Sequence, residues 1–113
     1  MSIPFVFMDL RTTDRERSRS FYGELFGWSA TESLFMGTGG PWGGLTQLAA
    51  DDERQPQWVP YASVDDLDKA VAQAVALGAT ATRPRVDLPQ GSVAVIEDPT
   101  GATVALWEPN RTS

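Results

Sequence analysis

The chain has 113 residues, which is enough for one domain with one hydrophobic core. Its net charge of −6 argues against a nucleic-acid backbone as the main partner, because that binding depends on clustered Lys and Arg. It contains no His and no Cys, so the usual ligands of zinc, iron and copper are missing. No run approaches the ~20 apolar residues of a membrane helix, and the N-terminus lacks the pattern of a signal peptide, so we expect a cytoplasmic protein.

The first half of the chain predicts a strand, a helix and three further strands. An apolar run at residues 5–10 is typical of a strand, and a helix is expected from Asp14 to Phe26, capped by Thr13 or Asp14 and stopped by Gly27. Three more strands are expected at 28–30, 32–36 and 44–49, with a flexible Gly-rich turn at 37–44.

Two side-chain patterns accompany the helix. Phe21, Leu25 and Phe26 fall on one of its faces. Four arginines cluster near its start, at positions 11, 15, 17 and 19, and they alternate with Asp14 and Glu16. We interpret this mixed-charge run as a solvated helix face and not as a nucleic-acid site.

The same order of elements recurs in the second half. A strand at 58–64 precedes a helix that is capped by Asp65 or Asp66, runs through Leu77 and ends at Gly78. Strands at 80–83, 92–97 and 102–107 follow, with a turn at 98–101. The buried stripe of the second helix is expected to comprise Leu67, Val71, Ala74 and Val75. We therefore predict a single domain of two tandem βαβββ units, at about 4–50 and 58–109, joined by a linker at 51–57.

Three motifs in this order resemble the vicinal oxygen chelate superfamily, also called the glyoxalase/bleomycin-resistance/dioxygenase family. They are Asp14 followed by FYGELFGW at 21–28, VDDLD through ALGA at 64–79, and DPTG at 98–101 followed by ALWE. The resemblance covers residues 4–109. It implies an α+β fold in which the two units form a curled eight-stranded mixed sheet around a cavity, often in a homodimer that in some members exchanges units.

The resemblance also implies where metal enzymes of the family hold their metal. Those positions fall on Phe7, Val59 and Ala105, and all three are apolar. Asp9 points to the same side as Phe7, Glu108 points away from Ala105, and Glu97 lies in the neighbouring strand. One inward carboxylate does not make a metal site, so we predict no metal and no cofactor.

The residues that share a face with those positions are predicted to line a ligand pocket. Trp42, in the Gly-rich turn, can act as an aromatic flap or pack within the turn. Asp9 can be a solvated residue, a partner of Arg83 or Arg85, or a ligand acceptor. The predicted ligand-binding residues are Phe7, Asp9, Trp42, Val59, Tyr61, Thr103, Ala105 and Trp107.

Three functions are consistent with this sequence. The first is a metal-free protein that sequesters an apolar or aromatic metabolite or drug, as in the bleomycin-resistance branch of the family. The second is a metal-independent lyase, isomerase or cyclase that uses Asp9, Tyr61 or Glu97 as acid or base, with a metal-dependent lyase or dioxygenase of the family as a further alternative. The third is a regulatory or structural partner with a vestigial pocket. The expected partners are a small-molecule ligand and a second copy of the chain, with no nucleic acid and no membrane.

Overall fold

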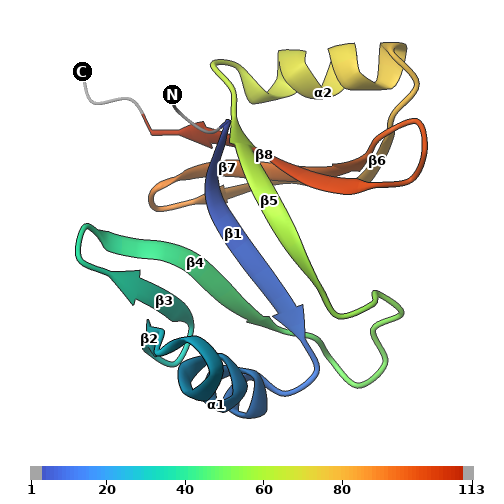
Figure 1. The fold of residues 1–113 in the computed structure, drawn as a ribbon. Coiled ribbons are helices and arrows are strands. Elements are labelled where there is room, and N and C mark those ends of the chain that lie inside the picture. The colour runs from blue at the N-terminus through green and yellow to red at the C-terminus, as the bar shows by residue number, and fades with distance from the viewer. Residues whose placement is uncertain (1–3, 111–113) are drawn as a thin grey trace. The chain divides into compact units, whose positions relative to one another are not determined.

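The computed structural model describes residues 4–110. Figure 1 shows the order of elements, which is the predicted one: a strand, a helix and three strands, and then the same again. The elements are β1 (Phe5–Thr12), α1 (Arg15–Phe26), β2 (Ser29–Ala30), β3 (Leu34–Gly37), β4 (Gly40–Gln47), β5 (Gln57–Ser63), α2 (Leu67–Ala76), β6 (Thr80–Leu88), β7 (Gly91–Glu97) and β8 (Thr103–Pro109).

The strands form an eight-stranded mixed sheet, in the order β2-β3-β4-β1-β5-β8-β7-β6. The pairs β1–β4 and β5–β8 are parallel, while β2–β3, β3–β4, β6–β7 and β7–β8 are antiparallel. The α+β fold class is therefore confirmed. Neither helix in the described part of the chain has the length and apolar character needed to cross a membrane.

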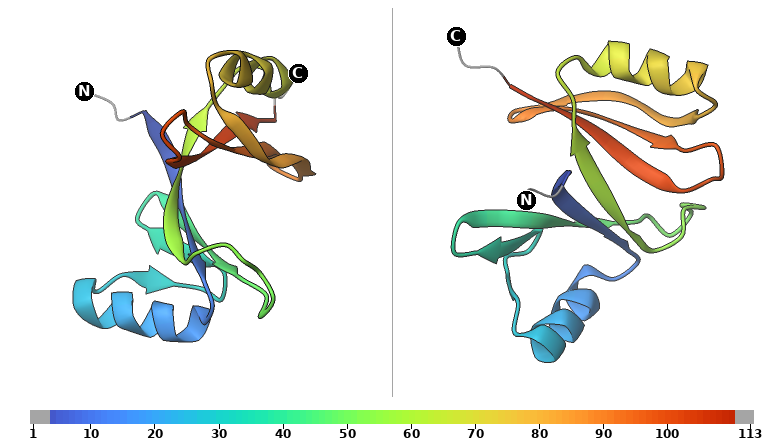
Figure 2. Two further views of the ribbon diagram at one scale, coloured as in Figure 1. Left: turned by 90° about the vertical axis from the view of Figure 1, so that its right-hand side faces the viewer. Right: turned by 45° about the horizontal axis from the view of Figure 1, so that its top comes forward.

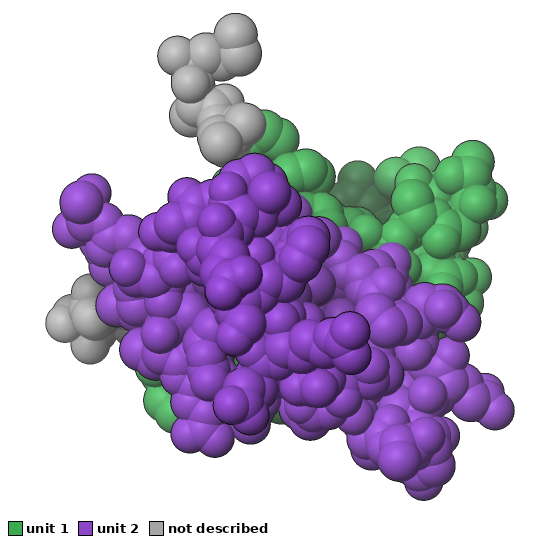
Figure 3. Space-filling model, turned by 60° about the horizontal axis from the view of Figure 1, so that its bottom comes forward, with its two compact units in different colours: residues 1–6, 60–113 green, residues 7–59 purple. Residues whose placement is uncertain are grey.

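The chain divides into two compact units, which Figure 3 colours separately. Unit 1 comprises residues 1–6 and 60–113, and unit 2 comprises residues 7–59. Within unit 1, α2 covers one face of β6, β7 and β8, as Figures 1 and 2 show. Within unit 2, α1 lies beside β2, β3 and β4. Each unit has a core of its own.

The core of unit 2 is built largely from aromatic rings. Leu10, Phe35 and Leu45 are its buried members, and Tyr22 packs on them from α1. Trp28, Trp42 and Trp58 complete the cluster. The Nε1 of Trp58 donates a hydrogen bond to the Tyr22 hydroxyl at 3.1 Å, so a buried polar group of the cluster is paired.

A bulge in β4 explains why Trp42 belongs to this core. Phe35 pairs with Gly43, but the next residue, Met36, pairs with Pro41, so Trp42 is an extra residue in the ladder. The extra residue places the Trp42 ring against Phe35, with ring centroids 4.9 Å apart and planes at 15°. The predicted flexible turn at 37–44 is wrong, because the strand already begins at Gly40 after a two-residue turn.

The two helices begin where their capping residues predict. The Asp14 side chain accepts a hydrogen bond from the Arg17 backbone N–H, and Asp66 accepts one from Lys69 in the same way. Gly27 ends α1 with φ of 75°, a conformation that favours glycine. Thus Asp14 and Asp66 are the N-caps, and the alternatives Thr13 and Asp65 are not.

The apolar faces of the helices differ from the prediction. Phe21, Leu25 and Phe26 are each more than half exposed, because α1 packs on the core through Tyr22 instead. In α2, Leu67 is buried and Val71 and Ala74 pack on the core, but Val75 is 49% exposed and does not belong to the buried stripe.

Glu108 acts as a second cap for α2. Its Oε1 accepts a hydrogen bond of 2.7 Å from the Leu67 backbone N–H, in the first turn of the helix. Strand alternation predicted that Glu108 points away from Ala105, on the face of β8 that carries Leu106. Helix α2 covers this face, so Glu108 can reach its first turn.

We expect Glu108→Ala to destabilise the protein by about 1–2 kcal/mol, because a helix N-terminus loses a charged acceptor. Urea unfolding at pH 7 measures the change, with Glu24→Ala on the exposed side of α1 as the matched control. Equal stabilities of the two variants would show that the Glu108 bond contributes nothing.

Candidate functional site

The most unusual polar group of unit 2 is the carboxylate of Asp9, in the middle of β1. Its relative exposure is 9%, in a strand segment that also buries Leu10. The Thr46 hydroxyl, from β4, lies 3.0 Å from Oδ1 and 2.8 Å from Oδ2. A hydroxyl carries one hydrogen, whereas a carboxylate accepts about four hydrogen bonds. Thr46 therefore satisfies only part of the acceptor capacity of Asp9.

Gly44 makes the space in which this carboxylate lies. β1 and β4 run parallel with Asp9 opposite Gly44. A Cβ atom at Gly44 would lie 2.5 Å from Oδ1 of Asp9 and 3.3 Å from Cε2 of Phe7. Phe7 and Asp9 thus share one face of β1, as their spacing predicted, and the other face carries Leu10 in the core.

Burial dominates the electrostatics of the site. It raises the pKa of the Asp9 carboxyl, and three weaker effects oppose it: the Thr46 hydrogen bond and the charges of Arg11 and Arg54. Arg54 is held by Asp52, which its Nη2 contacts at 2.6 Å, and this hydrogen-bonded pairing raises the pKa of Arg54. The site therefore combines a desolvated carboxylate with two permanently charged guanidinium groups.

The arginines near Asp9 differ from those that were predicted. Arg11 does not belong to a solvated helix face, since it lies on β1 with 6% exposure. Arg85 does not pair with Asp9, because it binds Asp68 at 3.0 Å and Asp87 at 2.9 Å. Alternation along β1 places Arg11 on the same face as Asp9. This signal was overlooked because Arg11 was grouped with the charged residues that follow it.

Thr46 and Gly44 were not among the predicted residues. The alternation of Gly44, Leu45 and Thr46 contains the signal, since the apolar residue points to the core and its neighbours point away. The pairing of β4 with β1 is non-local, however, and its register decides which side chain of β4 reaches Asp9.

We expect Thr46→Val to destabilise the protein by about 1–3 kcal/mol at pH 7, because a buried carboxylate loses its hydroxyl donor. The loss should shrink below pH ~3.9, where the carboxyl is protonated in the folded and unfolded states alike. Thermal unfolding at pH 7 and pH 3 measures this, and Thr46→Ser is the control that keeps the hydroxyl. A Val variant as stable as the Ser variant at both pH values would contradict this role.

The remaining predicted residues of unit 2 lie in contrasting surroundings. Val59 is fully buried, on the alternate face of β5 from Trp58. Phe7 is half-buried beside Gly44. Trp42 is part of the aromatic core, and its contact with a ligand stays a prediction.

In unit 1, the predicted residues occupy the face of the sheet opposite α2. Tyr61 pairs with Ala105, and Ala105 is fully buried. The rings of Tyr61 and Trp107 lie 6.2 Å apart at 40°. Trp107 covers Gly91, where a Cβ atom would lie 2.7 Å from Cζ2 of the indole. Thr103 is half-buried on the same face, two residues before Ala105.

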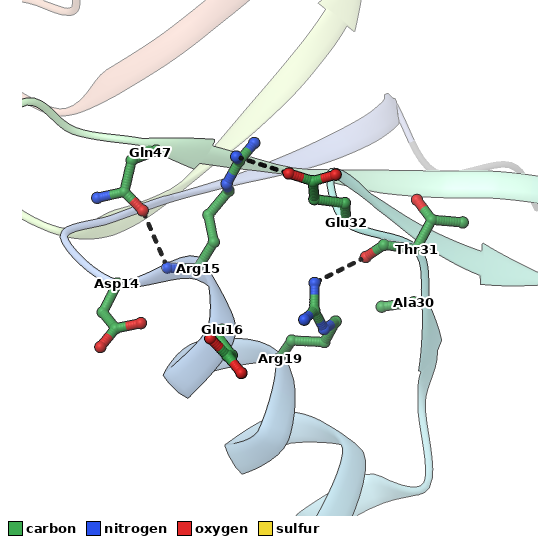
Figure 4. A pocket seen from close by; sticks show the side chains of 8 residues that line it. All are labelled: Asp14, Arg15, Glu16, Arg19, Ala30, Thr31, Glu32 and Gln47. Atoms are coloured by element: carbon green, nitrogen blue, oxygen red, sulfur yellow. Dashed lines mark hydrogen bonds and ion pairs between the residues drawn. The ribbon is translucent and has the colours of Figure 1, made fainter.

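A separate hollow of about 720 Å³ opens beside the start of α1 (Figure 4). Arg15 contacts Glu32 at 3.5 Å across it, and Arg19 donates to the backbone oxygen of Thr31. Exposed ion pairs of this kind contribute little to stability or binding. None of the eight side chains that line it is a predicted ligand residue; they are Asp14, Arg15, Glu16, Arg19, Ala30, Thr31, Glu32 and Gln47.

Comparison with known proteins identifies the family. The model of the Glyoxalase/Bleomycin resistance protein/Dioxygenase superfamily matches residues 4–106, and the chain belongs to this superfamily. The Mycobacterium bovis protein CFP32, provisionally named a glyoxylase, is 34% identical over 93% of this chain and 45% of its own length. The anthracycline biosynthesis protein DauV of Streptomyces sp. strain C5 is 30% identical over 90% of this chain and 40% of its own.

The chain thus spans about half the length of these curated relatives. Among solved structures, the Mn(II)-bound glyoxalase from Novosphingobium aromaticivorans superposes with a TM-score of 0.64 at 15% identity, over 97% of this chain and 42% of that one. At this identity the likeness concerns the fold alone.

The side chains at the positions where the resemblance predicts a metal do not fit one. Phe7, Val59 and Ala105 offer no donor atoms. Within residues 4–110, no three His, Cys, Asp or Glu side chains gather closely enough to hold an ion. Asp9 supplies one carboxylate, with both oxygens near the Thr46 hydroxyl, whereas a tight site needs three or more ligands.

Proposed function

We propose that the protein binds a small apolar or aromatic molecule without a resident metal, and that Asp9 is the polar anchor of the ligand. The observation that carries this proposal is the burial of Asp9 with a single neutral hydroxyl donor among the described residues. A buried charge lowers stability unless it is well paired, so its retention in a strand is more simply explained by binding than by folding.

The apolar side chains near this carboxylate support an apolar ligand. Phe7 lies beside it, and Val59 of the same unit is fully buried. In unit 1, Tyr61 and Trp107 form an aromatic pair of their own, and with Thr103 and Ala105 we propose them as ligand contacts within that unit. A mostly apolar lining with few polar groups is the usual composition of a small-molecule site. The relative named for anthracycline biosynthesis accords with an aromatic ligand.

A screen of planar aromatic compounds, read by the quenching of Trp fluorescence, tests the proposal. We expect saturable binding without conversion of the ligand, and weaker binding in Asp9→Asn. The absence of binding across such a screen would favour the reading in which the site is vestigial and the protein acts through another partner.

A second candidate is a metal-independent lyase, isomerase or cyclase. It is favoured by the direction of the Asp9 pKa, which burial raises above the ordinary value of a carboxyl. This activity would be established if the wild type converts a bound ligand and Asp9→Asn does not, while the variant still binds the product. Simple sequestration would show no conversion by either protein.

We also propose that the protein is a homodimer and that the exposed face of α1 takes part in the contact. Phe21 and Leu25 are 56% and 57% exposed one helical turn apart, and exposed apolar patches often mark interfaces. We expect a mass of about twice 12.3 kDa in light scattering at micromolar concentration. Leu25→Asp should yield the monomer, with Glu24→Asp as control, and a monomeric wild type would refute the proposal.

A further inference from the structure

The charges around Asp9 balance one another. Arg11 on β1 and Arg54 in the segment between β4 and β5 act on Asp9 as cations, and Asp52 in the same segment binds Arg54. β4 contributes only the neutral Thr46. The four groups Asp9, Asp52, Arg11 and Arg54 therefore sum to zero charge, while Asp51 and Glu53 of the same segment are exposed to solvent. A cation that approached Asp9 would lose its hydration without meeting an excess of negative charge.

The hydrogen-bonding groups at Asp9, unlike the charges, are not balanced, because acceptors outnumber donors. Thr46 uses its only hydrogen on the carboxylate, so the pair presents oxygen lone pairs. Oδ1 lies close to the backbone of Gly44, where the missing side chain leaves room for the carboxylate and adds no further donor. A ligand group that fits must donate a hydrogen bond and need not carry a charge.

We propose that the Asp9–Thr46 pair binds an uncharged hydroxyl group, of the alcohol or phenol class, on an otherwise apolar ligand. This inference rests on the proposed function, since it names the class of ligand for the same site. A hydroxyl donates its hydrogen to Asp9 and avoids the desolvation of a charge. The site should bind an apolar analogue less tightly, because that analogue leaves the buried carboxylate without a hydrogen-bond donor.

The proposal has a consequence for pH that separates a hydroxyl from a cation. When Asp9 takes up a proton, the carboxyl becomes a donor, and a hydroxyl oxygen can accept the bond instead. The affinity for a hydroxyl ligand should therefore fall less on acidification than the affinity for a cation, which loses its counter-charge. The charged groups that act on Asp9 are Arg11 and Arg54, and both stay cationic throughout this comparison.

Four naphthalene probes test the proposal: 2-naphthol, naphthalene, 2-naphthylmethylamine and 2-naphthoate. They share one apolar body and differ in carrying a hydroxyl, no polar group, a cation or an anion. Dissociation constants and the shifts of the Asp9, Gly44 and Thr46 backbone amides are measured by ¹H–¹⁵N NMR at pH 7. We expect 2-naphthol to bind about tenfold or more tightly than each of the other three, a difference of about 1.4 kcal/mol.

Asp9→Asn is the matched variant. It should reduce the preference for 2-naphthol over naphthalene to about twofold or less, because the charged acceptor is lost. Tighter binding of the amine, or equal binding of naphthalene and 2-naphthol, would overturn the ligand class while leaving a binding site at Asp9. If none of the four probes shifts these amides, the proposed function fails, and the ligand class fails with it.

Discussion

Asp9→Asn should weaken ligand binding and make the protein more stable at neutral pH. The carboxylate is buried at 9% exposure, and asparagine keeps the size of the side chain and an oxygen for the Thr46 hydroxyl. It removes the charge whose desolvation opposes folding. We expect a gain on the order of 1 kcal/mol and a rise of a few degrees in Tm. Stability gained together with function lost is the mark of a residue kept for binding.

The pH dependence of this gain follows from the direction of the Asp9 pKa. Burial raises the pKa of the folded carboxyl above its unfolded value, so the stabilising contribution of the protonated carboxyl is complete below pH ~3.9. It is lost as the pH rises through the folded pKa. The Asn variant should therefore exceed the wild type at pH 7 and match it near pH 3.

Urea unfolding at the two pH values measures this difference. Asp51→Asn, at an exposed carboxylate of the segment between β4 and β5, is the control, and it should change stability little at either pH. A destabilised Asp9→Asn at pH 7 would show that the carboxylate supports the fold, and would remove the main reason for assigning it to a ligand.

Gly44→Ala should reduce ligand binding strongly and lower stability by roughly 1–3 kcal/mol. The new methyl carbon would lie 2.5 Å from Oδ1 of Asp9 and 3.3 Å from a ring carbon of Phe7, so the carboxylate must move. A displaced Asp9 loses its geometry with Thr46. Binding titration and thermal unfolding of the same sample separate the two effects.

Gly39→Ala is the matched control for this variant. Gly39 lies in the turn that precedes β4, and a Cβ atom there meets no atom within 4 Å. We expect it to bind ligand like the wild type. Gly43→Ala provides a contrast, because its Cβ atom would lie 2.6 Å from the backbone oxygen of Met8 and should damage the fold itself. If Gly44→Ala binds the ligand as tightly as the wild type, the ligand does not bind at Asp9.

Local signals in the sequence account for most of the fold. Asp14 and Asp66 each follow a strand and precede a helix, and Gly27 terminates the first helix. These caps act over three or four residues, so they can be recognised without knowledge of the tertiary structure. The repeated order of elements then led to the α+β class, with eight strands in one mixed sheet.

Features that depend on strand register and side-chain packing were missed. The bulge at Trp42 arises from the way β3 pairs with β4, and it makes Trp42 part of the core, where the sequence left a flap and packing within the turn both open. Arg11 looked like one member of a charged run, although β1 continues to Thr12 and buries it. Helix α1 packs through Tyr22, a choice among neighbouring aromatics that hydrophobic periodicity alone does not make.

The candidate site was predictable in part for the same reason. Alternation along β1 correctly placed Asp9 on the face of Phe7 and away from Leu10. The partners of Asp9 are Thr46, 37 residues along the chain, and the cations Arg11 and Arg54. The register of the parallel strands β1 and β4 decides the contact with Thr46, and no pattern within either strand encodes that register.

The central claim is that Asp9 binds an organic ligand and not a metal. Native mass spectrometry of the purified wild type and Asp9→Asn, with metal analysis of the same samples, tests it most directly. We predict an organic small molecule retained by the wild type and lost from the variant, with no stoichiometric transition metal in either. Stoichiometric metal in the wild type that disappears in Asp9→Asn would contradict the claim and identify Asp9 as a metal ligand.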